Sequence, residues 1–206
     1  MKEPHANYTQ TQVNDAITLR YRLNRQGRDD LVFDFSQALS FKRNIVGVYG
    51  QSGTGKSTML KAIAGLIKGA EYSLAFDGQA YTNLSASNNP CVYVGAESIL
   101  FEHLDVKGNL NLVIRQTNYA ALAKLGLNEV LDKCGITHLL NQKPSALSSG
   151  EQQRVKFARA LLCGKPCILL DEAFSALDWQ TRHYFIDLLE SLHQNHGFVF
   201  MLVSQS

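Results

Sequence analysis

Apolar and polar residues alternate near the start of the chain in a way that predicts a β-hairpin. Residues 17–23 and 31–35 each alternate with period two, and the polar stretch 25–30 between them is typical of a turn. A short apolar run at 45–49 predicts a buried strand, and helical spacing follows at 59–66. Further strands are predicted at residues 72–76, 91–94, 167–170 and 198–204.

The stretch 105–143 has helical spacing and no strand pattern, and Asp105 is a plausible N-cap at its start. We therefore expect one domain over residues 1–206. Its α/β core would comprise residues 1–95 and 145–206, with a helical subdomain inserted at 96–144. The short apolar runs favour a mostly parallel core sheet, preceded by the antiparallel hairpin.

Composition narrows the class of protein. The chain has 206 residues, of which 45% are hydrophobic and 18% charged, as in an ordinary globular domain. The net charge of +2 and the lack of a basic run give no reason to expect a nucleic-acid partner. No apolar stretch is long enough to span a bilayer, so we expect any membrane connection to go through a partner. The four cysteines lack zinc spacing and are expected to be buried thiols.

The strongest motif lies between the strand at 45–49 and the helix at 59–66. It fits G-x-x-x-x-G-K-[ST] and consists of Gly50, Gln51, Ser52, Gly53, Thr54, Gly55, Lys56, Ser57 and Thr58. Backbone N–H groups of such a loop and the helix N-terminus attract phosphate, and the lysine reaches the β- and γ-phosphates. A glycine-rich hairpin turn is the simpler alternative, but a turn needs neither the Lys-Ser pair nor the helix. We predict that this chain binds a nucleoside triphosphate.

A second site element is the apolar run 167–170, which leads into Asp171 and Glu172. Two carboxylates at the carboxyl end of a buried strand form the Walker B arrangement. Asp171 would hold Mg²⁺ directly or through water, together with the Ser57 hydroxyl, and Glu172 would orient and polarise the attacking water. An exposed acidic turn is the alternative interpretation.

Residues 147–154 (Leu-Ser-Ser-Gly-Glu-Gln-Gln-Arg) open another helix, for which Ser148 or Ser149 would be a good N-cap. With residues 175–178 (Ser-Ala-Leu-Asp) and the two motifs above, they have the order and spacing of an ABC-type ATPase. The resemblance covers residues from about 30 to 206, and 147–151 resembles the family signature L-S-G-G-Q. Through residues 99–110 the chain is most similar to the ATP-binding subunits of molybdate importers.

The resemblance implies a P-loop NTPase that works as a dimer with ATP and Mg²⁺. In this family two copies pack head to tail, so Ser148 and Gly150 would contact the γ-phosphate bound to the partner copy. ATP hydrolysis would drive transmembrane permease subunits docked on the helical subdomain and the loop 95–105. The resemblance also implies a cytoplasmic protein, peripheral on the inner face of the cell membrane.

Departures from the family pattern bear on the rate of hydrolysis. Ala96 stands where the family has its Q-loop glutamine, although the neighbouring Glu97 could reach a metal-bound water. Gln205 stands in place of the switch histidine; its amide can donate a hydrogen bond to the γ-phosphate but cannot carry a proton. The sequence stops at Ser206, where the family normally continues with a helix and two strands, so by this resemblance we expect the family's C-terminal tail to be missing, through either truncation or loss. We therefore predict that ATP and Mg²⁺ bind and that hydrolysis is slower than in intact relatives.

Two alternatives stay open. One is a degenerate ATP-binding regulator without useful turnover, and the other is a soluble ABC ATPase that acts on DNA or the ribosome. The coiled-coil insertions, zinc modules or second cassette of the latter class are not visible here. The sequence does not identify the transported solute, because specificity in this family lies in other subunits.

Overall fold

The computed structural model describes residues 16–25, 28–40, 45–67, 73–76, 79–82, 84–114 and 125–203. Its strands are β1 (Ala16–Arg25), β2 (Arg28–Ser40), β3 (Ile45–Val48), β4 (Ser73–Phe76), β5 (Gln79–Thr82), β6 (Cys91–Val94), β7 (Cys167–Asp171) and β8 (Val199–Val203). Its helices are α1 (Lys56–Ile63), α2 (Val106–Ile114), α3 (Leu127–Lys133), α4 (Ser149–Leu162) and α5 (Trp179–His196), with short 3₁₀ turns at Thr137–Leu139 and Pro144–Ala146. The α/β fold class predicted from the sequence is confirmed.

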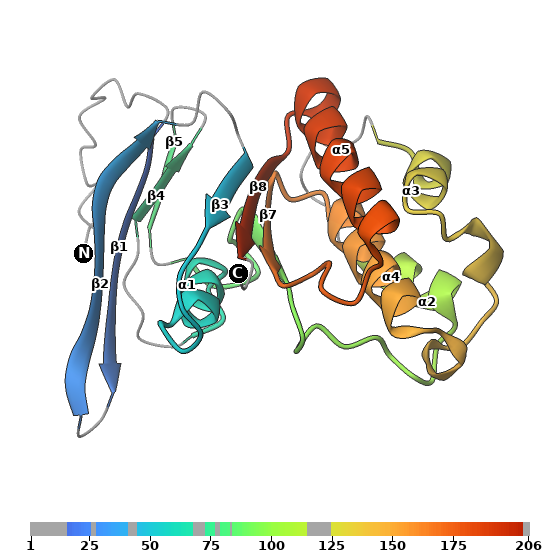
Figure 1. Ribbon diagram of the computed structural model, residues 1–206, viewed down its shortest axis with the longest axis horizontal. Coiled ribbons are helices and arrows are strands. Elements are labelled where there is room, and N and C mark those ends of the chain that lie inside the picture. Colours follow the sequence, from blue (N-terminus) through green and yellow to red (C-terminus); the bar gives the residue numbers. More distant parts are fainter. Residues whose placement is uncertain are drawn as a thin grey trace, which may run out of the picture.

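The central sheet has four strands in the order β3-β8-β7-β6, and every neighbouring pair is parallel. The predicted hairpin is present as the antiparallel pair β1 and β2, and a second antiparallel pair is formed by β4 and β5 (Figure 1). Two elements, β5 and α5, are absent from the sequence prediction. The strand β5 is short and runs into a polar stretch, whereas α5 carries a clear start signal in Asp178, whose carboxylate accepts from the backbone N–H of Thr181.

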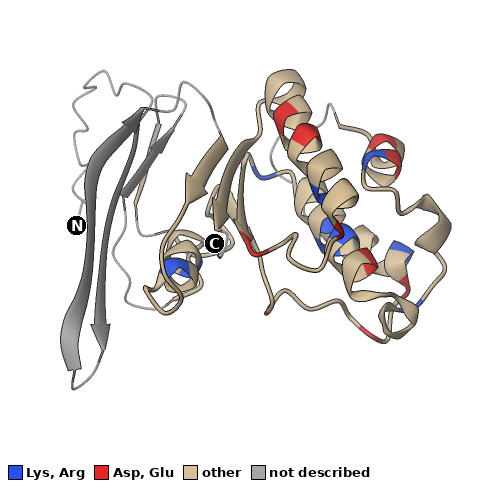
Figure 2. Ribbon diagram, viewed as in Figure 1, with Lys and Arg blue, Asp and Glu red and all other residues tan. Residues whose placement is uncertain are grey.

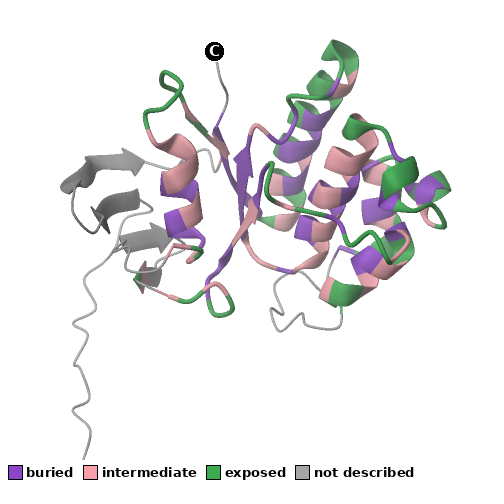
Figure 3. Ribbon diagram, turned by 90° about the horizontal axis from the view of Figure 1, so that it is seen from below, coloured by how far each residue is buried: buried purple, intermediate pink, exposed green. Residues whose placement is uncertain are grey.

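Successive residues of the central strands face opposite sides of the sheet, and each side has its own hydrophobic cluster. Cys167 and Leu169 of β7 pack with α1, whereas Ile168 and Leu170 pack with α4 and α5. Figure 3 shows the buried strands between α1 on one side and the longer helices on the other. The strands are apolar at almost every position because both faces are covered.

The cluster on the α4 side also holds the predicted helical block in place. Val106 and Leu110 of α2 and Val130 of α3 are buried in the same cluster as Phe157 of α4. The start of α2 is capped as predicted, since the Asp105 carboxylate accepts from the N–H of Gly108 at 2.6 Å. Among the described residues no helix is long and apolar enough to cross a membrane.

One charged residue interrupts the apolar strands of the central sheet. Strands β3, β6 and β8 carry none, and β7 carries Asp171 at its last position (Figure 2). Asp171 has the same parity as Cys167 and Leu169, so it faces the α1 side of the sheet. The strand register therefore delivers a carboxylate to the N-terminal end of α1.

Phe157 anchors the larger cluster, and its removal tests that assignment. Its side chain is fully buried and its ring meets those of Phe174 and Phe185 at centroid distances of 5.6 Å each. We expect Phe157→Ala to lower the free energy of unfolding by about 3–5 kcal/mol, because the variant loses buried apolar surface and also leaves a cavity in the core. Ile186→Ala, on the exposed side of α5, should cost less than about 1 kcal/mol. Urea unfolding measures both, and equal losses would contradict this account of the core.

Candidate functional site

The loop between β3 and α1 curls tightly around the side chain of Lys56. Gly53 and Gly55 have φ values of 81° and 88°, a region that favours glycine. The Lys56 Nζ donates to the backbone oxygens of Gly50 at 2.5 Å and Gln51 at 2.7 Å. The Thr54 hydroxyl donates to the same Gln51 oxygen at 2.9 Å. The predicted phosphate loop therefore has a defined shape with an ammonium group at its centre.

This loop opens onto a pocket of about 210 Å³ at the N-terminus of α1. The pocket is lined by Ser52, Gly53, Gly55, Lys56, Ser57, Thr58 and Glu172. The first N–H groups of a helix have no partner within the helix, and the helix dipole favours an anion at this end. The P-loop motif and the second residue of the predicted acidic pair thus share one cavity, although Lys56 and Glu172 are 116 positions apart in the sequence.

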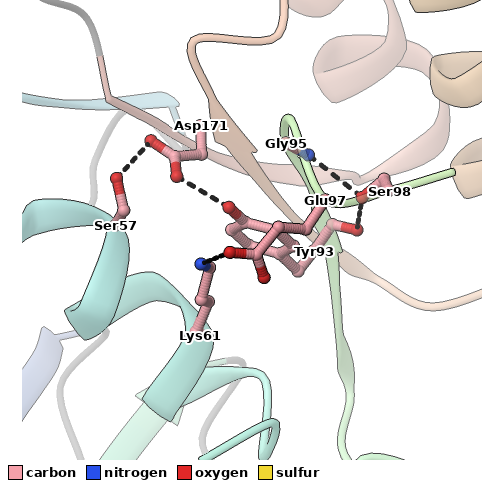
Figure 4. A network of polar contacts seen from close by, with 7 residues as sticks. All are labelled: Ser57, Lys61, Tyr93, Gly95, Glu97, Ser98 and Asp171. Carbon is pink, nitrogen blue, oxygen red and sulfur yellow. Dashed lines mark hydrogen bonds and ion pairs between the residues drawn. The ribbon is translucent and has the colours of Figure 1, made fainter.

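Asp171 is joined to α1 and to the neighbouring strand by two hydrogen bonds. The Ser57 hydroxyl donates to its Oδ1 at 3.0 Å, and the Tyr93 hydroxyl donates to its Oδ2 at 2.7 Å (Figure 4). Burial, and then the hydrogen bond to Asp171, raise the pKa of Tyr93 well above its ordinary value, so the phenol stays a donor. The Ser57 hydroxyl and the Asp171 carboxylate are oxygen ligands of the kind that Mg²⁺ prefers, and the pair fits that ion.

Tyr93 was not among the residues singled out from the sequence. It supplies the only side-chain oxygen in the strand Cys91–Val94, and a half-buried tyrosine hydroxyl usually has a partner. That signal indicates that a partner exists but does not identify it, because the partner lies on another strand.

Glu172 follows Asp171 in an unusual backbone conformation. It is the one non-glycine residue with positive φ in the described part of the chain, at 51°. Its N–H donates to the Val203 oxygen of β8 at 3.0 Å, and its own oxygen accepts from the Ser175 N–H at 3.0 Å. These bonds turn the chain sharply at the end of β7, and Glu172 lines the phosphate-loop pocket.

The start of α4 is closed by a capping box, with Ser148 rather than Ser149 as the N-cap. The Glu151 carboxylate accepts from both the N–H and the hydroxyl of Ser148, at 2.8 and 2.7 Å. These bonds lower the pKa of Glu151 below its ordinary value. Glu151 therefore caps its own helix.

Ser148 and Gly150 do not line the phosphate-loop pocket. Gly150 instead packs beside Leu177. A Cβ added at Gly150 would lie 3.2 Å from the Cδ2 of Leu177. Gln153, a residue not singled out from the sequence, links α4 to the segment 175–178. Its Oε1 accepts from the Ala176 N–H at 3.2 Å, and its Nε2 donates to the Ser175 hydroxyl at 3.4 Å. The structure thus joins the signature stretch to residues 175–178 as one unit.

Ala96 is exposed at the turn that follows β6. Its neighbour Glu97 forms an ion pair with Lys61 of α1, with 2.5 Å between Oε1 and Nζ. The carboxylate that we considered for a metal-bound water is therefore engaged with a lysine. Gln205, the other residue predicted to be catalytic, lies outside the described residues.

A P-loop fold whose glycine-rich loop shares one pocket with Glu172, and whose Ser57 is bonded to Asp171, defines a nucleotide-binding protein. The family model described as ABC transporter matches residues 38–175, and the chain belongs to this family. Its curated relatives include molybdenum import ATP-binding proteins named ModC, in agreement with the molybdate-importer resemblance.

ModC of Saccharophagus degradans is 36% identical over 168 residues, or 80% of this chain and 46% of that protein. ModC 1 of Azotobacter vinelandii is 34% identical over 196 residues, or 92% of this chain and 53% of that protein. ModC of Pseudomonas aeruginosa is also 34% identical, over 93% of this chain and 54% of that protein. The chain thus spans about half the length of the curated relatives that it matches.

Two solved structures of the ABC transporter cassette MJ0796 share this fold. One is described as a dimeric bacterial cassette, and the other as a dimeric post-hydrolysis state bound to ADP and Pi. Each is 27% identical with a TM-score of 0.71, covering 92% of this chain and 87% of that chain.

The capping box predicts an acid-dependent loss of stability. At pH 7 Glu151→Gln should lower the free energy of unfolding by about 0.5–1 kcal/mol, because the amide is a weaker acceptor at the helix N-terminus. The folded pKa of Glu151 is below its ordinary value of 4.5, so this contribution is present above that pH and lost as the pH falls through the folded pKa. Urea unfolding from pH 7 to 3 should show the two proteins converging. Glu190→Gln, exposed in α5, serves as the control and should show no such difference.

Proposed function

We propose that this chain is the ATP-binding subunit of an ABC importer, which binds and hydrolyses ATP between two copies to drive solute uptake through transmembrane partner subunits. The observation that carries the proposal is the shared pocket of the P-loop and Glu172, with Ser57 bonded to Asp171 at 3.0 Å. Membership of the ABC transporter family and the importer names of the relatives support it.

In this proposal residues 50–58 hold the triphosphate. Backbone N–H groups of the loop surround the β- and γ-phosphates, and the Lys56 ammonium, now bonded to loop oxygens, turns to the phosphates. Ser57 and Asp171 would hold Mg²⁺, which would supply positive charge next to the phosphates. Glu172 orients the attacking water and accepts its proton, and Gln205 donates a hydrogen bond to the γ-phosphate.

The second half of each ATP site would come from another copy of the chain. Ser148 and Gly150 lie at the N-terminus of a 14-residue helix but outside the phosphate-loop pocket of their own chain. A head-to-tail dimer would place this helix start against the γ-phosphate of the partner's ATP. The dimeric state of the solved cassettes supports this arrangement. ATP would then join the two copies, and hydrolysis would release them.

The helical block 96–144, which we propose as a subdomain, and the loop 95–105 would receive the membrane partner. Ile99 and Phe101 are large apolar side chains with exposures of 67% and 43%. The loop is held in shape by the buried Asn109, whose side chain bonds both the N–H and the oxygen of Phe101, at 2.8 and 3.1 Å. A preformed apolar surface loses little conformational entropy on docking. Such docking would place the protein on the cytoplasmic face of the cell membrane.

For the solute we propose a molybdenum oxyanion, the choice that the ModC names of the relatives favour. Uptake by cells that express the chain with a candidate permease measures this directly. Loss of molybdate uptake on deletion of the chain, restored by the intact gene, is the expected result. Unchanged molybdate uptake with loss of uptake of another anion would reassign the solute.

The second candidate is an ATP-binding regulator with little turnover, favoured by the exposed alanine at position 96 and by the pairing of Glu97 with Lys61. Both proposals share ATP-driven dimerisation and differ in hydrolysis. We propose slow hydrolysis rather than none, since Lys56, Ser57, Asp171 and Glu172 are all in place. Phosphate release with and without the membrane subunits separates the two.

Replacement of Glu172 tests the hydrolytic site. We expect Glu172→Gln to keep ATP binding but to lower phosphate release at least about 100-fold, because the amide cannot accept a proton from water. The variant should also accumulate as an ATP-bound dimer in size-exclusion chromatography. Glu190→Gln, a matched change on the surface of α5, should behave as wild type. Phosphate release unaffected by Glu172→Gln would refute the role of Glu172.

Replacement of Phe101 tests the docking loop. We expect Phe101→Ser to lower co-purification with the permease about tenfold or more, because apolar contact area is lost at the centre of the loop. Ile186→Ser, at a 43% exposed isoleucine of α5 outside the proposed docking region, provides the control. Pull-down from membranes measures both variants. Equal recovery of permease by the two variants would place the docking surface elsewhere.

A further inference from the structure

A tyrosine hydroxyl, and not the residue at the Q-loop position, connects β6 to the magnesium ligands. Tyr93 and Asp171 lie on adjacent parallel strands, where Tyr93 pairs with Leu169 and Asp171 is two residues further along β7. Both therefore face the α1 side of the sheet, and the long phenol covers the diagonal distance. The Asp171 carboxylate is 7% exposed and receives one bond on each oxygen, from Ser57 and Tyr93.

The position of the phenol depends on the absence of a side chain at residue 95. Gly95 follows Tyr93 by two residues, and a Cβ built on it would lie 2.6 Å from the ring carbon Cζ and nearer still to the hydroxyl. Ser98 fixes the backbone around this pair. Its hydroxyl donates to the backbone carbonyl oxygen of Tyr93 at 3.3 Å and accepts from the Gly95 N–H at 3.1 Å. Gly95 thus leaves the space in which the phenol reaches Asp171.

The other side of the ring is limited by a charged pair. The Lys61 Nζ lies 5.8 Å from the Tyr93 ring centroid and is bonded to Glu97 (Figure 4). This contact orients the ring between α1 and the turn after β6. Rotation of the phenol away from Asp171 would have to displace the ammonium or enter the space of residue 95.

Groups that bond a metal-ligating carboxylate fix its orientation and typically matter for metal affinity. We propose that Tyr93 is a positioning residue that holds the Asp171 carboxylate in the orientation in which it binds Mg²⁺ together with Ser57. The bond to Oδ2 prevents rotation of the carboxylate and leaves Oδ1 directed at the Ser57 hydroxyl. The hydrogen bond from Tyr93 to Asp171 originates within β6. It therefore does not depend on the residue at the Q-loop position, which is Ala96 in this chain. This inference rests on the Mg²⁺-ATP site proposed above.

The test measures how much Mg²⁺ strengthens nucleotide binding, without any hydrolysis. A fluorescent, non-hydrolysable ATP analogue is titrated with the purified chain in Mg²⁺ and in EDTA. The dissociation constant in EDTA divided by the dissociation constant in Mg²⁺ gives the contribution of the metal to binding. Tyr93→Phe should lower this ratio about fivefold, the effect of one net hydrogen bond, with the constant in EDTA unchanged. Gly95→Ala should lower it similarly, since it displaces the phenol without changing its chemistry. Tyr184→Phe, which removes a hydroxyl bonded to the Lys133 oxygen at 2.9 Å, is the matched control and should keep the wild-type ratio.

A double-mutant cycle separates positioning from packing. In an Asp171→Ala background, Tyr93→Phe should have no further effect on the ratio, because the carboxylate that Tyr93 orients is already absent. Wild-type affinity that is equal in Mg²⁺ and EDTA would refute the proposed magnesium site itself. A metal-dependent wild type with an unchanged ratio in Tyr93→Phe would overturn the positioning role alone. Equal weakening of both constants in Tyr93→Phe would also overturn it, since that result indicates a structural role.

Discussion

The site depends on one hydrogen bond, from the Ser57 hydroxyl to the Asp171 carboxylate at 3.0 Å. It joins the first turn of α1 to the last residue of β7, two elements that pack together on one side of the sheet. A buried carboxylate is costly unless donors compensate it, and Ser57 and Tyr93 provide two. The same bond fixes the distance between the phosphate loop and Glu172, and therefore the width of the pocket between them.

Helix α4 connects the two regions that the proposed function requires. At its start, Gln153 is bonded to residues 175 and 176, beside the signature stretch. One helical turn and a half further on, the Arg159 guanidinium donates to the Ile99 oxygen in the docking loop at 2.8 Å. Burial lowers the pKa of Arg159, but a guanidinium stays charged at physiological pH. A movement of α4 at the proposed interface between two copies would thus be transmitted directly to the loop that carries Ile99.

Local motifs were predictable from the sequence, whereas contacts between distant segments were not. The phosphate loop and the strand Cys91–Val94 depend on neighbouring residues, and the structure has them where the pattern places them. The bond from Tyr93 to Asp171 requires the register of two strands 78 residues apart, which no local pattern contains. The pairing of Lys61 with Glu97 has the same cause. The choice between Ser148 and Ser149 as N-cap was resolved by the geometry of the capping box, which requires the exact residue at which the helix starts.

The left-handed backbone at Glu172 has a consequence for the evolution and engineering of this protein. A side chain in that region costs about 1–2 kcal/mol that a glycine would avoid. Selection for thermostability alone would favour replacement of the glutamate, and the proposed role of Glu172 implies that such variants would lose ATP hydrolysis. Under the proposed mechanism, this one position therefore sets folding stability against the rate of hydrolysis.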